Sequence, residues 1–388
     1  MIKKLSMEFV DFVREIYKDE KIIPLHRPIF DDKEKKILVE CIDSNFVSTT
    51  GKLVNKFEKK VQDFTGIKYA VSTVNGTAAL HIGLKLLGVK KDDEVITQSL
   101  NFVASSNAIS YCNARPVFID VNKENFGMCP KALNNFLTKN ATRSKGFLIN
   151  KYTGNKISAC LPLHVFGNPC DIISIKKVCD KFGLPILEDI AESLGSFVGK
   201  KHTGSFSDVS TLSFNGNKII TTGGGGMILT NNKKIFKEAK HITTTAKLPH
   251  RYEYIHDQVG FNYRMPNLNA ALGCAQIQKI KNIIRVKRKI ANLYKDFFKS
   301  YDIDFLTEDS NSNSNYWLNT IILKTEAHQK KFLDYTNKNG IMTRPLWRLM
   351  SNLKMYKKCQ SDNLKNSKFL EKRVVNIPSS VPNIFNEK

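Results

Sequence analysis

The chain of 388 residues is long enough for two ordinary domains, and its hydrophobic content of 41% is typical of a globular protein. No stretch approaches the roughly 18 uncharged apolar residues of a membrane span, and the net charge of +24 comes from scattered lysines, so neither a membrane nor nucleic acid is the expected partner. The eight cysteines form no C-x-x-C pair, which disfavours zinc and disulfides and favours a reducing cytoplasm.

The N-terminal segment MIKKLSMEFVDFVREIYKDEK begins with a basic pair and carries acids throughout its apolar part. It has no small-residue cleavage site, so we expect residues 1–22 to form an added helix rather than a signal peptide. An entry segment and a helix follow in IIPLHRPIFDDKEKKILVECIDSNF. The polar loop 48–51 then leads to another helix in KLVNKFEKKVQDFTG.

From Lys68 onward, strand patterns alternate with helix patterns, through YAVSTV, DEVITQSL, RPVFIDV, ACLPLHVF and PILEDI. Strands separated by helices of roughly 10–15 residues indicate βαβ units and a mainly parallel sheet. The sequence therefore predicts an α/β fold with a doubly wound domain. In such a sheet, ligands bind at the carboxyl ends of the strands.

Three chemical features stand at such strand ends. The stretch VNGTAALHIGL leads through Gly76 and Thr77 into a helix, whose free N–H groups suit a phosphate. The strand PILED ends in Glu188 and Asp189. Lys218 lies on a short turn between two apolar segments, where poor solvation favours a neutral, nucleophilic amine that forms Schiff bases. One of 60 Lys and Arg is weak evidence alone, but lysine, acid and phosphate turn together are the parts that bind pyridoxal phosphate (PLP).

Four motifs carry a more specific resemblance: NGTAAL, LEDIAESLGS, SFNGNK followed by TTGGGGMILTN, and GFNYRMPNLNAAL. From about Ile23 to the C-terminus the chain resembles the DegT–StrS family of PLP-dependent nucleotide-sugar aminotransferases. The resemblance implies fold type I of the PLP-dependent transferases, with a large PLP-binding domain over residues 23–285 and a smaller C-terminal α+β domain over residues 286–388. It also implies a homodimer whose active sites are completed across the interface.

The resemblance assigns roles to individual residues. Lys218 and Asp189 are the implied catalytic pair, because the lysine holds PLP and moves protons while the acid keeps the pyridine nitrogen protonated. The implied cofactor contacts further include a phosphate turn at Gly76 and Thr77. Phe102 is the implied stacking ring and Glu192 an implied polar contact. Ser213 supplies a strand-end hydroxyl, and Asn262 supplies an amide that reaches the neighbouring subunit. The implied substrate-site residues are Arg264, Arg344 and Trp347, and no metal is expected.

Several of these residues also have plainer interpretations. Phe102 alone would be read as a core phenylalanine, and Arg344 and Trp347 as a surface arginine and a packed tryptophan. Glu192 stands where the family often carries Gln or His, so a carboxylate there needs a different protonation or hydrogen-bond arrangement. The stretch TEDSNSNSN is predicted to be a flexible connector by its composition.

The implied reaction moves the amino group of L-glutamate to a 4-keto-6-deoxy sugar linked to UDP, or else to GDP or dTDP, giving a 4-amino sugar for surface glycans. Within the family, the NGNK turn, the glycine run and the N-terminal helix resemble enzymes of the legionaminic-acid and bacillosamine pathways. A 3-keto sugar aminotransferase stays open. A PLP-dependent or PMP-dependent sugar dehydratase is disfavoured because those relatives replace the lysine by histidine. A basic scaffold without catalysis is disfavoured because lysine, acid, serine and phosphate turn are all present.

Overall fold

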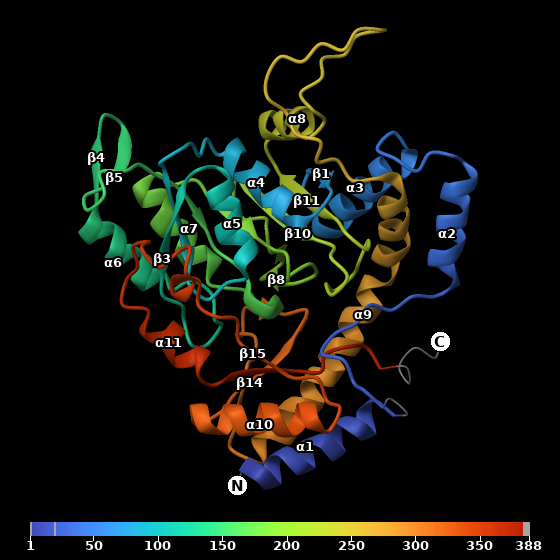
Figure 1. Ribbon diagram of the computed structural model, residues 1–388, viewed down its shortest axis with the longest axis vertical. Helices are drawn as coiled ribbons and strands as arrows, with labels where there is room; N and C mark the ends of the chain where they lie inside the picture. The colour runs from blue at the N-terminus through green and yellow to red at the C-terminus, as the bar shows by residue number, and fades with distance from the viewer. Residues whose placement is uncertain (1, 19–20, 383–388) are drawn as a thin grey trace.

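The computed structural model describes residues 2–18 and 21–382. Its large domain is built on one extended sheet (Figure 1). The strands of this sheet are β1 (Tyr69–Thr73), β2 (Glu94–Gln98), β3 (Arg115–Ile119), β6 (Ile157–Leu161), β7 (Leu187–Asp189), β10 (Val209–Ser213) and β11 (Gly226–Thr230). The four-stranded part, in the order β1-β11-β10-β7, continues through parallel bridges from β7 to β6 into the three-stranded part β6-β2-β3. Of these strands, β11 alone runs antiparallel to its neighbours, and the other strand pairs are parallel. The predicted mainly parallel sheet is therefore confirmed.

Helices cover both faces of this sheet because consecutive strand residues point to opposite sides. Val95 of β2 packs in one apolar cluster with α4, α5 and α8, whereas its neighbour Ile96 packs in another with α6 and α7. The flanking helices are α3 (Lys52–Thr65), α4 (Gly76–Leu86), α5 (Val103–Tyr111), α6 (Pro130–Asn140), α7 (Ile172–Phe182) and α8 (Lys233–Ile242). The doubly wound arrangement therefore follows from near-continuous apolar strands buried on both sides.

The small domain is an antiparallel sheet in the order β12-β14-β16-β15 with helices packed beside it. Its elements are β12 (Asp304–Phe305), β14 (Asn319–Ile322), β15 (Arg344–Pro345), β16 (Val374–Ile377), α10 (Glu326–Lys338) and α11 (Lys365–Glu371). The predicted N-terminal helix is present as α1 (Ile2–Ile16) and lies along α10 (Figure 1). Phe9 of α1 is fully buried, with its ring centroid 5.0 Å from that of Phe332 in α10.

One long helix joins the two domains. The helix α9 (Asn267–Lys299) has 33 residues and runs from the large domain down to the small one (Figure 1). The predicted domain boundary between residues 285 and 286 thus falls inside one continuous helix.

The entry helix α2 (Asp32–Asp43) packs against α9 and begins with a capping box, in which Asp31 and Glu34 bond each other's main-chain N–H groups.

The polar connector of the small domain, residues 307–315 between β12 and β14, is ordered, so its predicted flexibility is wrong. Residues Ser312 and Asn313 form β13, which pairs with β8 (Phe197–Val198), itself paired with β9 (Lys201–His202). Ser314 and Asn315 are buried, because their polar groups find hydrogen-bond partners in the large domain. The remaining short elements are β4 (Ala141–Ser144), β5 (Phe147–Asn150) and the 3₁₀ turns η1 (Val165–Gly167) and η2 (Met350–Asn352).

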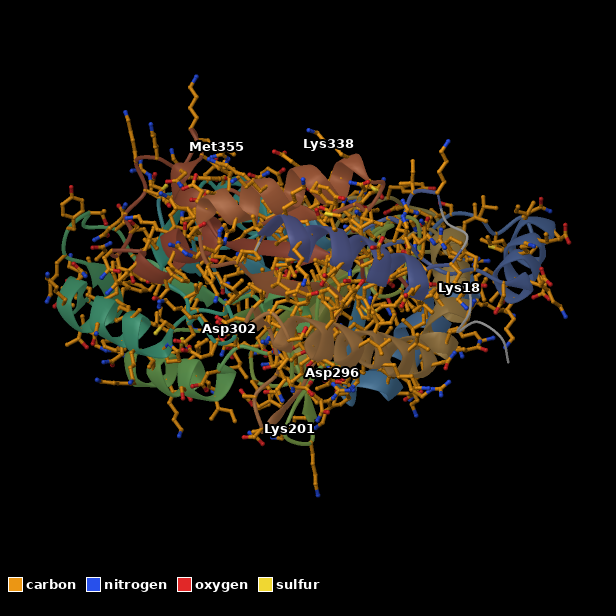
Figure 2. The ribbon with its side chains drawn as sticks, turned by 90° about the horizontal axis from the view of Figure 1, so that it is seen from below. Lys18, Lys201, Asp296, Asp302, Lys338 and Met355 are labelled. Atoms are coloured by element: carbon orange, nitrogen blue, oxygen red, sulfur yellow. The ribbon has the colours of Figure 1, made fainter. Side chains whose placement is uncertain are left out.

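Four features bear on the membrane, metal, disulfide and nucleic-acid functions that the sequence disfavours. In residues 2–18 and 21–382, no helix is long and apolar enough to cross a membrane, and no cluster of three metal-ligating side chains occurs. All eight cysteines are unpaired. Lys18, Lys201 and Lys338 lie at different edges of the molecule (Figure 2), in keeping with a scattered rather than gathered positive charge.

Candidate active site

A cavity of about 310 Å³ lies at the carboxyl ends of β7 and β10, where the small domain meets the large one. It brings together eight side chains or turns that the sequence singled out, namely Gly76, Thr77, Phe102, Asp189, Glu192, Ser213, Lys218 and Trp347. A larger and more open cavity of about 610 Å³ lies between α6 and the segment around α11, away from Lys218. The smaller cavity is the candidate active site, because it alone of the two is lined by the lysine.

Lys218 lies on the turn that follows β10, and its side chain reaches into this cavity. The residue is 9% exposed. Its Nζ lies 3.3 Å from Oε1 of Glu192 and 4.1 Å from the ring centroid of Trp317. The amine is therefore held between a carboxylate and an aromatic face, in a site shielded from most of the solvent.

Asp189 is the last residue of β7 and is 4% exposed. Its Oδ2 accepts a hydrogen bond from the Ser105 hydroxyl (2.8 Å), and its Oδ1 accepts one from the Ala191 N–H (3.1 Å). Burial raises the pKa of Asp189 above its usual range, although these two donors and the charge of Lys218 favour the ionised form. A cationic partner in the cavity would stabilise this carboxylate as an ion.

The neighbouring acid, Glu188, points to the other face of the strand, as the alternation of side chains predicts. It is fully buried and accepts N–H bonds from Gly204 and Phe206, both at 3.0 Å. His164 lies 2.9 Å from the same carboxylate through Nε2, while its Nδ1 accepts the Cys170 N–H (3.1 Å). This arrangement places the ring proton on Nε2 and makes Glu188 a structural acceptor behind the site.

Glu192 follows β7 and is 2% exposed. Its Oε2 accepts the main-chain N–H of Phe166 at 2.8 Å, so only Oε1 faces Lys218. Burial raises the pKa of Glu192, and the nearby ammonium of Lys218 opposes this shift. The sequence predicts that a carboxylate here, where the family often carries Gln or His, needs a different hydrogen-bond arrangement. The separate bonds of Oε1 and Oε2 are such an arrangement.

The turn before α4 offers free donors for an anion. Asn75 caps the helix by accepting the Ala78 N–H (2.7 Å), while the N–H groups of Gly76 and Thr77 have no acceptor among the described residues. A Cβ at Gly76 would lie 2.9 Å from Cβ of Ser213, so glycine is needed for this close approach. Two free N–H groups, a hydroxyl and a helix N-terminus make a site that fits a phosphate.

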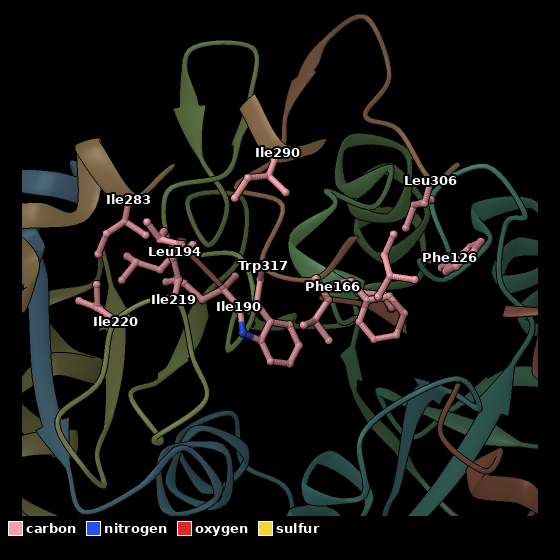
Figure 3. Packing of buried hydrophobic residues seen from close by; sticks show 14 of the residues in the cluster. Phe126, Phe166, Ile190, Leu194, Ile219, Ile220, Ile283, Ile290, Leu306 and Trp317 are labelled. Carbon is pink, nitrogen blue, oxygen red and sulfur yellow. The ribbon is translucent and has the colours of Figure 1, made fainter. Parts of the chain in front are cut away.

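Aromatic side chains form the remaining wall. Phe102 precedes α5, is 50% exposed and contacts Trp347 edge to face at 6.1 Å. Trp317, which the sequence reading missed, is 3% exposed and donates its indole N–H to the Asn217 carbonyl oxygen (2.7 Å). Figure 3 shows it between Ile190 and Phe166. The sequence offered only the rarity of tryptophan as a signal, since the chain has two; the structure shows that both line this cavity.

Three predicted residues lie outside the cavity of their own chain. Asn262 is exposed and Arg264 is partly exposed, and each main chain bridges another segment of the large domain. Arg344 is exposed on β15, where its guanidinium donates to Asn337 Oδ1 and to the Thr343 carbonyl oxygen, both at 2.9 Å. The structure does not place Arg344 beside Trp347 at the cleft, because the strand turns its side chain toward α10.

Residues 28–387 match the model of the DegT/DnrJ/EryC1/StrS aminotransferase family. The chain belongs to this family. It is 35% identical to the GDP-perosamine synthase of Vibrio cholerae over 363 residues (92% of this chain, 94% of that protein) and 35% identical to that of Escherichia coli O157:H7 (95% and 96%). The solved structure of the aminotransferase TlmJ from Streptoalloteichus hindustanus superposes with a TM-score of 0.84 at 22% identity, covering 92% of this chain and 93% of that one. Helicobacter pylori PseC, an aminotransferase involved in pseudoaminic acid biosynthesis, gives 0.83 at 23% (92% and 94%).

The family membership makes this chain a sugar aminotransferase with pyridoxal phosphate as its cofactor. The predicted fold type I is confirmed by the family and by its solved structures. The donor set fits the cofactor, since a lysine, a strand-end carboxylate, an anion cradle and an aromatic ring face one cavity. Lys218, Asp189, Ser213 and the turn at Gly76 and Thr77 are the groups that would hold it.

Proposed function

We propose that this sugar aminotransferase transfers the amino group of L-glutamate to the keto carbon of a 4-keto-6-deoxy sugar linked to a nucleotide. The observation that carries the proposal is the shielded Lys218 amine, 3.3 Å from Glu192 and in the same cavity as Asp189 and a free helix N-terminus. A family of binding proteins without catalysis would not need a buried lysine whose nearest partners are a carboxylate and an aromatic ring.

Each residue has a distinct task in this proposal. The N–H groups of Gly76 and Thr77 and the Ser213 hydroxyl bind and orient the phosphate. Asp189 holds a proton on the ring nitrogen, and the bound cofactor then supplies an electron sink for carbanion chemistry. The Lys218 amine, once free, removes a proton from one carbon and returns it to another. Trp317 shields that amine from water.

The nucleotide of the acceptor is inferred from the relatives of the chain. The sequence alone favoured UDP, and with it the legionaminic-acid and bacillosamine pathways. Two relatives that match this chain along nearly its whole length are named for a GDP-linked product. GDP-linked 4-keto sugars are therefore the first acceptors to test, followed by UDP-linked and dTDP-linked ones.

A homodimer is part of the proposal. The segment after α8 projects from the body of the molecule (Figure 1) and carries the exposed side chains of Tyr252 (76%), Tyr254 (80%) and Val259 (85%). Apolar side chains this exposed suit a surface that a second subunit covers. Asn262 and Arg264 follow this segment, and we propose that they act at the neighbouring subunit's site.

The unpaired state of all eight cysteines supports a reducing compartment, the cytoplasm.

The first test is the visible absorbance spectrum of the protein with PLP, before and after L-glutamate is added. The expected result is a band of lysine-bound cofactor that glutamate converts to the spectrum of the aminated cofactor. Aminated product from 4-keto rather than 3-keto nucleotide sugars would then fix the acceptor. Sugar dehydration without net amine transfer would replace the proposal by the dehydratase alternative, and absence of any bound cofactor would favour the scaffold.

A further inference from the structure

The amide of Asn315 is fully buried, although it belongs to the polar connector of the small domain. Its Nδ2 donates to the main-chain oxygens of Glu192 (2.8 Å) and Leu194 (3.0 Å). Its Oδ1 accepts the main-chain N–H of Trp317 (2.8 Å). One side chain therefore ties the segment after β7 to the tryptophan that packs on Lys218.

The main chain around this amide takes up left-handed conformations, which cost free energy at the two residues that are not glycine. Phe166 (φ 57°), Gly167 (φ 90°) and Tyr316 (φ 46°) all have left-handed backbones. A Cβ at Gly167 would lie 1.9 Å from Oδ1 of Asn315, so glycine is needed where the two segments meet. Strain of this kind persists where surrounding contacts over-determine it, and it concentrates at functional sites. Phe166 is also the residue whose N–H holds Glu192.

Further hydrogen bonds lock the same contact between the domains. The main-chain N–H of Asn315 donates to the Ser196 hydroxyl (3.0 Å), which in turn donates to the Gly167 carbonyl oxygen (2.7 Å). Trp317, two positions after Asn315, donates its indole N–H to the carbonyl oxygen of Asn217, one position before Lys218. The path from the connector to Lys218 is thus short, with hydrogen bonds from Asn315 to Asn217 and a cation–π contact between Trp317 and the Lys218 amine.

We propose that Asn315 is a positioning residue that fixes Glu192 and Trp317 around the Lys218 amine and so couples the small domain to the reaction at that lysine. The inference rests on the proposed function, in which Lys218 carries the cofactor. The Asn315 amide bonds the Glu192 carbonyl oxygen through Nδ2 and the Trp317 N–H through Oδ1, and the side chains of these two residues contact Nζ of Lys218. An amide that served stability alone would not need to bond both residues that contact Nζ.

Asn315→Asp tests the inference, because aspartate keeps the shape and an acceptor for Trp317 but cannot donate to the two carbonyl oxygens. Asn313→Asp is the matched control, since it makes the same change at an exposed position of the same connector. The measurement is the rate at which apoprotein and PLP develop the absorbance of lysine-bound cofactor, followed by kcat and KM for L-glutamate. We expect Asn315→Asp to lower the loading rate and kcat about 10-fold to 100-fold with KM changed less, as small misplacements do.

A second readout needs neither cofactor nor turnover. In a Trp347→Phe background, Trp317 is the single tryptophan, and its emission in the apoprotein reports its own packing. We expect Asn315→Asp to shift that emission to longer wavelength and Asn313→Asp to leave it unchanged. If wild type loads PLP and reacts with glutamate while Asn315→Asp matches Asn313→Asp in both readouts, the inference is overturned and the proposed function stands. If wild type does not load PLP, the proposed function fails first.

Ser196→Ala covers the case in which Asn315→Asp does not fold, as judged by far-UV circular dichroism. It removes the hydroxyl that links the Asn315 N–H to Gly167 and leaves the amide contacts in place. We expect about a 3-fold slower loading rate, because two hydrogen bonds of the hydroxyl are lost while the amide contacts to Glu192 and Trp317 stay in place, together with the same direction of emission shift. Wild-type behaviour in both measurements would overturn the inference on this variant.

Discussion

The two walls of the active-site cavity are built in different ways. The large-domain wall consists of the ends of regular elements, since Asp189 closes β7, Ser213 closes β10 and α4 begins at Gly76. The small-domain wall consists of irregular segments that carry Trp317 and Trp347. Groups that must bond a charged cofactor therefore stand on rigid strands and a helix, whereas the shielding groups are held by tertiary contacts.

Lys218→Ala gives the largest expected effect on the large-domain wall. Without the amine there is no nucleophile for the cofactor and no carrier for the proton, so we expect turnover to fall on the order of 10²-fold to 10⁴-fold or more. The absorbance of lysine-bound cofactor should disappear, while the circular dichroism spectrum stays that of wild type. Lys201→Ala, at an exposed site (Figure 2), is the control. Glutamate-dependent turnover at the wild-type rate in Lys218→Ala would exclude the assigned role.

Asp189→Asn tests whether the strand-end acid works through its charge. The amide can accept the Ala191 N–H and donate to the Ser105 hydroxyl, which can donate in turn to Asn101 Oδ1. We expect a folded protein with turnover lowered about 10²-fold, in the range of a lost catalytic electrostatic contact. Glu188→Gln is the comparison on the same strand, expected to lower stability by about 1–3 kcal/mol, because one of its two acceptor oxygens is replaced by an NH₂ group, with a smaller effect on kcat.

The pH dependence of apoprotein stability tests the raised pKa of Asp189. Burial raises the folded-state pKa of Asp189 above its unfolded value of about 4. The contribution of this acid is therefore fully present below about pH 4 and is lost as pH rises through the folded-state value. We expect the melting temperature of Asp189→Asn, measured without PLP, to gain on wild type as pH rises through that window. A constant difference between the two proteins would contradict the raised pKa.

Trp317→Phe tests the small-domain wall and has a smaller expected effect. It removes the indole bond to Asn217 and weakens the aromatic face under the Lys218 amine. We expect a loss of about 1–2 kcal/mol in unfolding free energy and a several-fold lower kcat, from one hydrogen bond and one cation–π contact. Urea unfolding and steady-state kinetics measure both. A loss of turnover as large as that of Asp189→Asn would show that the two walls contribute equally to the chemistry.

Arg344→Ala is expected to have the smallest effect. The guanidinium bonds only its own domain, at Asn337 and Thr343, among the contacts of the described residues. We expect KM for the nucleotide sugar and kcat to stay within about 2-fold of wild type, as for a surface substitution. A tenfold rise in KM for the sugar alone would return Arg344 to the substrate cleft that the sequence assigned to it.

The errors of the sequence reading share a physical cause. The connector around Ser312–Asn315 has the composition of a flexible linker, but composition does not reveal that large-domain donors and acceptors satisfy its polar groups. Trp317 was not singled out, because nothing local shows that its ring faces Lys218. The position of α1 beside α10 is equally invisible in the sequence, although its amphipathic helix was predictable.

The sequence by itself determined the alternating α/β pattern, the strand-end acid at Asp189, the anion-binding turn before α4 and the lysine on its turn. These features are local, since they depend on apolar periodicity, glycine placement and residue type within a few positions. Only the tertiary structure decided which side chains surround Lys218. Glu192 is oriented by Phe166, and Trp317 by Asn217 and Asn315, through contacts that span up to 123 residues of chain. The bonds from Asn315 to Glu192 and from Trp317 to Asn217 form only when the two domains fold against each other, and their partners lie at least 100 residues apart in the sequence.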